Sequence, residues 1–277
     1  MKLYDKIMLY GVHIEGGSAI RRESHDAIAR RLLQKAVRVE VSNVAEYMER
    51  AGKESWNVDE DAPHAVSPWP LAWFEYSSRT DAGIPVRVGT LSTSTPREDA
   101  GGWHVDASVY VVHTNGRVGH MGTVHKRVDR QGARDGQALF SMPDTGLPDD
   151  AMIAGLGTAM MPVYLACTFA HCKNVSTVDH RTPPKVAAKR RKAGKPIGVT
   201  YKTLVIDGMK EVLRTEGGVE RNGLKKALHI CRGHFATYTA DKPLFGKVTG
   251  TFWKPMHTRG TKSRGEVKKD YKVTASE

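Results

Sequence analysis

The longest uncharged stretch of the 277-residue chain spans residues 151–170 and constrains the fold more than any other feature. Twenty consecutive residues without a charge are about enough to cross a bilayer as a helix. The run is nevertheless rich in Ala, Gly, Thr and Met, and Pro162 interrupts it, which is typical of a buried core helix. Asp149 and Asp150 precede the run and can cap such a helix. We therefore predict a buried central helix and favour no membrane contact, with a membrane span as the alternative.

The region before this helix contains four short runs that are typical of strands. Residues 71–76 and 85–91 are two of them, and residues 105–113 and 118–124 flank Asn115-Gly116. An Asn-Gly pair between two β-branched runs is the strongest short signal for a hairpin. The first part of the chain is therefore expected to contain an antiparallel meander.

Other elements complete the predicted fold class. Ile28 and Leu32 share a face at helical spacing and predict a helix over residues 24–37. After the central helix, runs punctuated by Gly and Pro predict strands at about 201–207, 226–238, 249–258 and 267–273. The sequence thus predicts an α+β protein with an antiparallel β-meander in its N-terminal region, a central buried helix and a β-rich, basic C-terminal region.

Charge is divided sharply along the chain. Residues 1–180 carry 19 Lys or Arg against 22 Asp or Glu, whereas residues 181–277 carry 23 against 8. We expect a net-negative α+β region over 1–180, a basic Pro/Lys/Arg connection over 181–200, and a basic β-rich region over 201–277. The prolines around the stretch 181–196 suggest that it is exposed and mobile when no partner is bound.

The net charge of +12 favours an anionic partner, with nucleic acid the leading expectation and RNA or single strands preferred. A different anionic partner, or a basic tail that only aids solubility, are the alternatives. Three Cys in the whole chain fit a reducing compartment, and Asp5 and Lys6 stand where a signal peptide needs apolar residues. We therefore expect a cytoplasmic protein.

The densest polar and aromatic cluster lies in the last third of the chain and supplies the candidate catalytic residues, Arg232, His234, Tyr238 and His257. In a strand over 229–238, Arg232, His234 and Tyr238 point to one side. Arg can bind phosphate, and His can exchange a proton near neutral pH. These residue types suit metal-independent RNA cleavage, in which one group activates the 2′-hydroxyl and another protonates the leaving oxygen. The alternatives are nucleic-acid contacts without chemistry, or satisfied histidines within a sheet.

The candidate nucleic-acid-binding residues extend this surface and the basic stretch: Lys185, Lys189, Arg190, Arg191, Lys192, Lys195, Lys247, Trp253 and Arg259. The cations would hold phosphates, and Trp253 would stack an unpaired base. For Trp253 the alternative is packing in the core. Whether the two strands bring these side chains together depends on a register that a sequence does not specify.

No cofactor and no metal is expected. Cys167, His171 and Cys172 lack paired ligand spacing, and His113, His120 and His125 lack matching acids. The sequence also contains no phosphate-binding Gly-rich loop and no Gly-x-Ser-x-Gly turn, so that nucleotide hydrolysis and esterase chemistry receive no support.

Several motifs in residues 165–273 resemble an uncharacterised family of phage and prophage proteins. They are His-Ile-Cys-Arg-Gly-His-Phe at 229–235, Pro-Leu-Phe-Gly-Lys at 243–247, Trp-x-x-x-His-x-Arg-Gly at 253–260 and Val-Lys-Lys-Asp-Tyr-Lys-Val at 267–273. Cys172-Lys-Asn-Val175 and the Pro-Pro and Lys/Arg run at 183–192 are similar to the segment that precedes them. The resemblance implies a phage or mobile-element context and action in the bacterial cytoplasm, and it implies no activity.

Three functions remain as hypotheses at this point. The first is a phage-derived protein that binds nucleic acid through its basic C-terminal region. The second adds metal-independent endoribonuclease activity. The third is a phage accessory protein that binds and modulates a host protein through its acidic, Trp-rich N-terminal region. The oligomeric state is left open by all three.

Overall fold

The structure, a computed structural model, describes residues 2–14, 19–50, 56–79, 83–98, 101–112, 116–130, 132–133, 135–143, 148–193, 200–206, 227–231, 234–245, 247–254, 257–259 and 261–266. The chain divides into two compact units. Unit 1 consists of residues 1–171 and 175–205, and unit 2 of residues 172–174 and 206–277. The boundary at 205/206 differs from the expected connection at 181–200, because the basic stretch belongs to unit 1.

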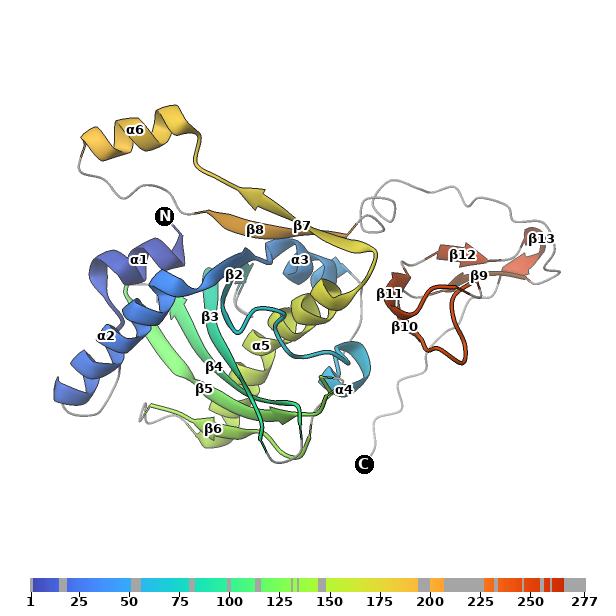
Figure 1. The fold of residues 1–277 in the computed structure, drawn as a ribbon, viewed down its shortest axis with the longest axis horizontal. Coiled ribbons are helices and arrows are strands. Elements are labelled where there is room, and N and C mark those ends of the chain that lie inside the picture. Colours follow the sequence, from blue (N-terminus) through green and yellow to red (C-terminus); the bar gives the residue numbers. More distant parts are fainter. Residues whose placement is uncertain are drawn as a thin grey trace. The chain divides into compact units, whose positions relative to one another are not determined.

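Unit 1 is an α+β unit built around one large sheet (Figure 1). Its elements in chain order are α1 (Leu3–Tyr10), α2 (Ala19–Lys35), β1 (Val37–Glu40), α3 (Ser42–Arg50), α4 (Val58–Asp61), β2 (Leu71–Arg79), β3 (Pro85–Pro96), β4 (Trp103–Val112), β5 (Val118–Val128), β6 (Leu139–Ser141), α5 (Asp149–His171), β7 (Val175–His180), α6 (Pro184–Lys192) and β8 (Tyr201–Ile206).

The eight strands of this sheet follow the order β6-β5-β4-β3-β2-β1-β8-β7. Strands β2 to β6 form successive antiparallel pairs, which confirms the predicted meander. Strand β1 pairs in parallel with both β2 and β8. The sheet thereby joins the meander to the strands that flank the basic stretch.

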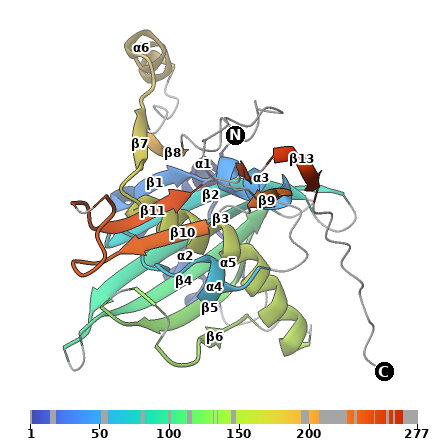
Figure 2. The ribbon, with the colours of Figure 1, turned by 90° about the vertical axis from the view of Figure 1, so that its right-hand side faces the viewer.

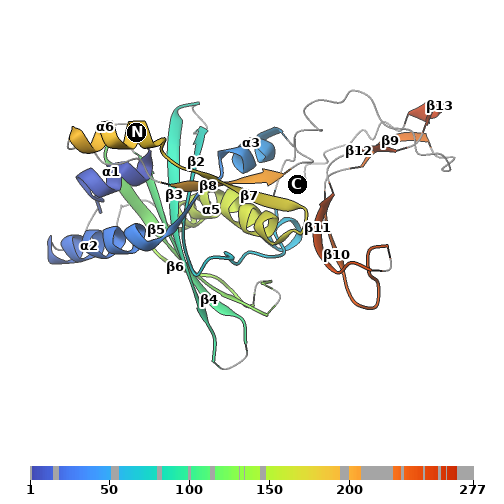
Figure 3. The same cartoon turned by 45° about the horizontal axis from the view of Figure 1, so that its top comes forward.

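Helices cover both faces of the sheet, with α1 and α2 on one face and α5 on the other (Figure 3). Strand β2 is buried on both sides, so its side chains alternate between these layers. Trp73 packs in a cluster with Leu3 and Leu33 from α1 and α2. Tyr76 points the other way, and its hydroxyl donates a 2.8 Å hydrogen bond to the carbonyl of Ala159 in α5.

Helix α5 is the predicted central helix. It is the one helix in the described residues that is long and apolar enough to cross a membrane, yet 72% of its most apolar window is buried inside the protein. Because its apolar side chains are already covered by the sheet and by α3 and α4, α5 is a core helix.

The predicted helix over 24–37 is present as α2, which begins earlier and ends at Lys35, because Val37 already belongs to β1. The side that it buries also differs from the expectation. Ala29 and Leu33 are buried, Leu32 is half-buried, and Ile28 is 50% exposed. The sequence pattern identified the helix and placed its apolar stripe one residue away from the observed one.

The basic stretch, which was expected to be exposed and mobile, contains the helix α6 (Figure 2). Pro184 occupies the first turn, where its missing N–H costs no hydrogen bond. The last turn carries Lys189, Arg190, Arg191 and Lys192, which interact favourably with the negative end of the helix dipole. None of its residues is buried.

Unit 2 consists of short strands: β9 (Ala227–Cys231), β10 (His234–Tyr238), β11 (Gly250–Lys254), β12 (His257–Arg259) and β13 (Thr261–Glu266). Strand β10 pairs with β11, and β9 pairs with β12, both antiparallel. The Asn174 side chain fixes β11, because it donates to the carbonyl of Trp253 and accepts from the N–H of Trp253. The described part of unit 2 is therefore β-rich, as expected, but the predicted strands 226–238 and 249–258 each contain two separate strands rather than one. The predicted strand 267–273 lies outside the described residues.

A glycine in the meander offers a test of this packing. A Cβ built on Gly89 would lie 2.2 Å from a ring carbon of Trp73, so we expect Gly89→Ala to lower the free energy of unfolding by about 1–3 kcal/mol. Gly157 in α5 has nothing within 4 Å of such a Cβ, so Gly157→Ala is expected to raise that free energy by about 0.5–1 kcal/mol. Urea unfolding of the two variants measures both values. Equal effects at the two sites would contradict the close approach of Trp73 to Gly89.

Candidate functional site

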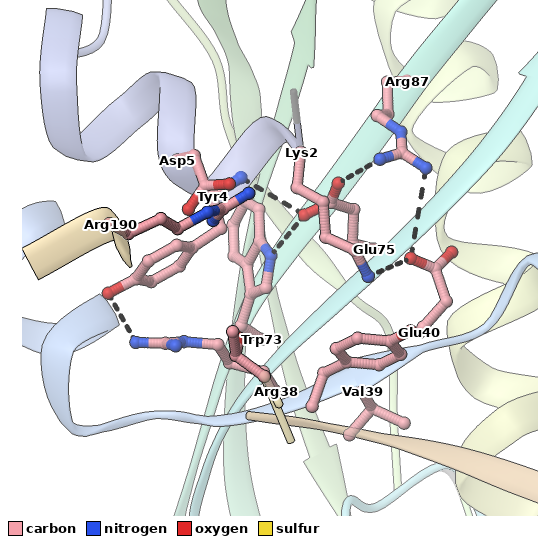
Figure 4. A pocket seen from close by; sticks show the side chains of 12 residues that line it. Lys2, Tyr4, Asp5, Arg38, Val39, Glu40, Trp73, Glu75, Arg87 and Arg190 are labelled. Carbon is pink, nitrogen blue, oxygen red and sulfur yellow. Dashed lines mark hydrogen bonds and ion pairs between the residues drawn. The ribbon is translucent and has the colours of Figure 1, made fainter. Parts of the chain in front are cut away.

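A cavity of about 390 Å³ opens in unit 1 where α1, β1, β2, β3 and β8 meet α6. Figure 4 shows its side chains, and most of them are charged or aromatic. The lining comprises Lys2, Tyr4, Asp5, Arg38, Val39, Glu40, Trp73, Glu75, Arg87, Thr182, Arg190 and Tyr201. Four basic and three acidic side chains thus face one space.

Glu75 organises the floor of this cavity. It lies in β2 and is only 3% exposed. Its carboxylate accepts hydrogen bonds from the backbone N–H groups of Leu3 and Tyr4 at 2.8 and 3.2 Å, which caps the N-terminus of α1. It also accepts from the indole of Trp73 at 3.1 Å and from Arg87 at 2.8 Å. With two partners on each oxygen, Glu75 is a structural anion and not a ligand group.

Glu40 neutralises a second part of the cavity. The ammonium of Lys2 donates to it at 2.8 Å, and the hydroxyl of Ser42 donates at 2.5 Å. The guanidinium of Arg87 lies 4.0 Å from the same carboxylate. Lys2 and Arg87 therefore already have acidic partners within the protein.

Arg38 and Tyr4 form a different kind of pair. The guanidinium of Arg38 donates to the Tyr4 hydroxyl at 2.5 Å and lies 3.6 Å from the centre of the Tyr4 ring. Burial raises the pKa of Tyr4 above its usual value, although the nearby Arg38 opposes this shift, so the phenol is neutral at pH 7. Burial also lowers the pKa of Arg38, yet a guanidinium keeps its proton at neutral pH. Arg38 therefore carries a positive charge whose nearest hydrogen-bond partner is uncharged.

Tyr201 forms another wall, and its ring is already in contact with polar groups of the protein. The His180 ring stacks on it with 4.8 Å between centroids and 14° between planes. The ammonium of Lys2 lies 3.5 Å from the centre of the same ring. The ring of Tyr201 is therefore already covered, while cationic side chains face the cavity. This lining suits a bound phosphate better than a stacked base.

Helix α6 contributes Arg190 to the cavity, so that a residue singled out in the sequence lies at this site. Arg190 is one of the predicted nucleic-acid-binding residues. Its guanidinium forms no hydrogen bond or ion pair with the described part of the chain. Asp179 is the only acid in the sequence between residues 173 and 206, and it pairs with Lys202 at 2.6 Å. The cations of α6 therefore have no acidic partner in their own segment.

The predicted C-terminal surface is only partly assembled. Strands β10 and β11 pair His234 with Lys254 and Phe235 with Trp253. Because side chains alternate, His234 and Tyr238 share one face of this ladder, and Trp253 lies on the other. Trp253 is 5% exposed and packs on Phe235 with 4.7 Å between ring centroids. Its expected role in stacking a base does not fit this position, because neighbouring side chains already cover the ring.

The register also separates the remaining candidates in this unit. In the pairing of β9 with β12, His257 lies opposite Cys231, and Arg259 lies opposite His229. Neither pairs with His234 or Tyr238, which lie in the separate β10–β11 ladder. Arg232 and Lys195 lie outside the described residues, so their positions relative to these groups are not described.

The other predicted cations are exposed. Lys185, Lys189, Arg191 and Lys192 lie on α6, and Lys247 lies in the turn between β10 and β11. They present charge to solvent, as the sequence predicted for phosphate contacts. None of these five residues lines the cavity; among the predicted cations, Arg190 does.

One further polar cluster was not predicted from the sequence. Asp106, His125 and Ser141 form a chain of hydrogen bonds of 2.7 and 2.9 Å across three neighbouring strands. The order of groups is that of a hydrolytic triad, but Asp106 and His125 are substantially exposed, and the described cavities do not adjoin them. We interpret the chain as cross-strand pairing on the sheet surface.

Among the described residues, no group of three or more His, Cys, Asp or Glu side chains is placed to hold a metal ion. Burial raises the pKa of the Cys167 and Cys172 thiols to about 12, so both are protonated at neutral pH.

The cavity itself was missed because its residues come from distant segments of the chain. One signal was available: Glu75 is the only charge in the apolar run 71–76. A charge in such a run is expected to have a partner when it is buried, and here it has four.

Comparison with known proteins assigns no family to the chain: no protein-family model and no curated protein matches it.

Proposed function

We propose that this chain is a cytoplasmic, phage-derived protein that binds the phosphate backbone of a nucleic acid, with α6 as its principal contact in unit 1. The observation that carries this proposal is α6 itself. Five of its nine residues are Lys or Arg, it contains no acid, and none of its side chains is buried. A solvent-exposed helix of this composition is an electrostatic surface for a polyanion.

The cavity beside α6 supports the same function. Arg190 and Arg38 both line it, and neither forms an ion pair with a carboxylate among the described contacts. Two guanidinium groups at one opening can share a phosphate, because each offers several donors in a plane. We infer that one phosphate of the bound strand enters this cavity while neighbouring phosphates lie along α6.

Salt dependence tests the proposal. Binding of fluorescent single-stranded RNA, single-stranded DNA and duplex DNA is followed by anisotropy over a series of KCl concentrations. For a single strand, each phosphate contact contributes about −0.7 to the slope of log Kobs against log salt. The variant Lys189→Gln/Arg190→Gln/Arg191→Gln is expected to make this slope less negative by about 2, because it removes three cations.

A matched control removes three exposed cations from the meander. Arg79→Gln/Arg127→Gln/Arg130→Gln lowers the net charge equally and is expected to leave the slope nearly unchanged, because these residues lie outside α6 and the cavity. Binding that does not depend on salt, or equal slopes for the two triple variants, would overturn the proposal. Gel analysis of the RNA after incubation in EDTA tests the ribonuclease alternative in the same samples.

Two neighbouring residues on α6 test the role of the cavity. Arg190 lines the cavity and Arg191 does not, although both are exposed and carry one charge. We expect Arg190→Gln to weaken single-strand binding several-fold more than Arg191→Gln, since only Arg190 can share a phosphate with Arg38. Equal losses in the anisotropy titration would show that α6 acts only as a charged surface.

A further inference from the structure

The turn between β10 and β11 holds an aromatic ring in an unusual position. Leu244 and Val248 close the turn by two backbone hydrogen bonds, with Leu244 N–H donating at 2.8 Å and Val248 N–H donating at 3.1 Å. The N–H of Lys247 donates to the Leu244 carbonyl at 3.2 Å. The base of the turn is therefore fixed, and the conformation of its tip is set by the chain itself.

Phe245 lies at this tip. Its side chain is 89% exposed, the highest value among the exposed large hydrophobic residues of the described chain. Its φ of 52° is in the left-handed region, and Phe245 is the one residue other than glycine with a positive φ in the described chain. A bulky residue in this region is strained, and exposure of a phenyl ring to water is unfavourable. Neither local backbone preference nor packing explains the position, so a functional explanation is warranted.

The charges around this ring indicate what binds it. Lys242 and Lys247 flank Phe245 in the sequence and are exposed, and Lys254 lies in the adjoining strand β11. Asp241 is the only acid between residues 234 and 254. An exposed ring between cations matches the arrangement by which proteins hold single strands, in which bases stack on aromatic side chains and phosphates lie against Lys or Arg.

We propose that Phe245 stacks on an unpaired base of a single-stranded nucleic acid, while Lys242 and Lys247 contact the adjacent phosphates. This inference rests on the proposed function and makes it more specific, because stacking on a protruding ring requires a base that is not paired in a duplex. It also replaces Trp253, whose ring is buried, as the stacking residue of unit 2.

The test compares substitutions at Phe245 in the full chain. Phe245→Ala is expected to bind single strands roughly tenfold more weakly, and Phe245→Trp is expected to bind about as tightly as the unchanged protein. Phe245→Leu keeps apolar volume without a π face, so it should behave like the Ala variant. Strands that contain the fluorescent base 2-aminopurine should show quenching with Phe or Trp at position 245 and none with Ala.

Two controls distinguish stacking by Phe245 from binding to any exposed aromatic residue and from the charge effect of α6. Tyr10 is a 75% exposed aromatic residue in unit 1, and Tyr10→Ala should leave binding unchanged. Because Phe245→Ala removes no charge, its salt slope should equal that of the unchanged protein, whereas the α6 variant changes the slope.

The outcomes distinguish the two proposals. If Phe245→Ala binds single strands as tightly as the unchanged protein while the α6 variant binds weakly, the stacking inference is wrong and the proposed function stands; a ring that serves a protein partner would give this result. Equal losses on duplex and single strands would also overturn the inference. If the unchanged protein binds no nucleic acid, both proposals fail.

Discussion

Replacing Glu75 with Gln is expected to lower the free energy of unfolding by about 3 kcal/mol, because the change removes the charge of a buried carboxylate that holds four hydrogen-bond donors, one of them the half-buried guanidinium of Arg87. Glu75 is 3% exposed and lies 2.8 Å from Arg87. Gln keeps the size of the side chain, so the loss measures charge and hydrogen bonding and not a cavity. Urea unfolding followed by tryptophan fluorescence reports the change, since the indole of Trp73 is itself a partner of Glu75.

The reason for so large an effect is that one carboxylate fixes two elements at once. It accepts from the backbone of Leu3 and Tyr4 at the start of α1 and from Trp73 and Arg87 in the sheet. A Gln amide can accept at its oxygen only, and its NH₂ group would oppose donors on the other side. We therefore expect loosening of α1 to accompany the loss of stability.

Glu46 supplies the matched control for this experiment. It pairs with Arg50 one turn later in α3, and both side chains are 56% exposed. Exposed helix pairs of this spacing contribute about 0.3–0.5 kcal/mol, so Glu46→Gln should be nearly neutral. If the two Glu→Gln variants lose similar stability, Glu75 does not organise the cavity as described.

The elements that the sequence predicted well are those specified by local pattern. The meander was predicted from one alternating run, from β-branched runs and from the Asn-Gly pair between two of them, and α5 was predicted from a run without charge. Helix α1 was missed, because its N-terminus is capped by Glu75, which lies about 70 residues away. Helix α6 was missed because its prolines and charges resemble an irregular segment, and no burial stabilises it.

The candidate site was harder to predict because it depends on register and on distant contacts. The two C-terminal runs do pair in antiparallel fashion, but the register places Trp253 opposite Phe235 rather than on the face of His234. A shift of one residue would have reversed this result. Arg190, by contrast, was identified from composition alone. A run of basic residues without acidic neighbours can be recognised in a sequence without knowing how any strands pair.

Phe245 illustrates a different limit. The Pro-Leu-Phe-Gly-Lys motif was visible in the sequence, but phenylalanine rarely adopts a positive φ, so no pattern predicts that its ring is held in solvent. The observation became available only with the turn geometry. The positive φ and the exposure of Phe245 together are the observations that connect this motif with binding.

The second large effect concerns pH and a pair of histidines between α2 and the meander. The rings of His25 and His120 lie 4.5 Å apart, and Tyr110 lies 5.3 Å from His120. Burial, reinforced by the nearby His25, lowers the pKa of His120 to about 4, and burial likewise lowers the pKa of His25, although Asp26 opposes that shift. Both imidazoles are therefore neutral in the folded protein at pH 7.

The sign of the pH effect follows from proton uptake. An unfolded histidine has a pKa of about 6.5, so between pH 6.5 and 4 the unfolded chain binds a proton at position 120 that the folded chain does not bind. Stability is therefore lost as the pH falls through this window and is unaffected by this group above it. The difference between the two pKa values corresponds to about 3 kcal/mol at pH 4.

We expect His120→Gln to remove most of this loss. The free energy of unfolding of the unchanged protein should fall by about 3 kcal/mol more than that of the variant between pH 7 and pH 4, because glutamine does not titrate. Carboxylates also titrate in this range, but they are common to both proteins and cancel in the difference. His13→Gln, at a histidine outside this ring cluster, controls for the loss of an imidazole and should follow the unchanged protein. Parallel curves for the unchanged protein and His120→Gln would mean that His120 is not the buried, neutral group on which α2 packs.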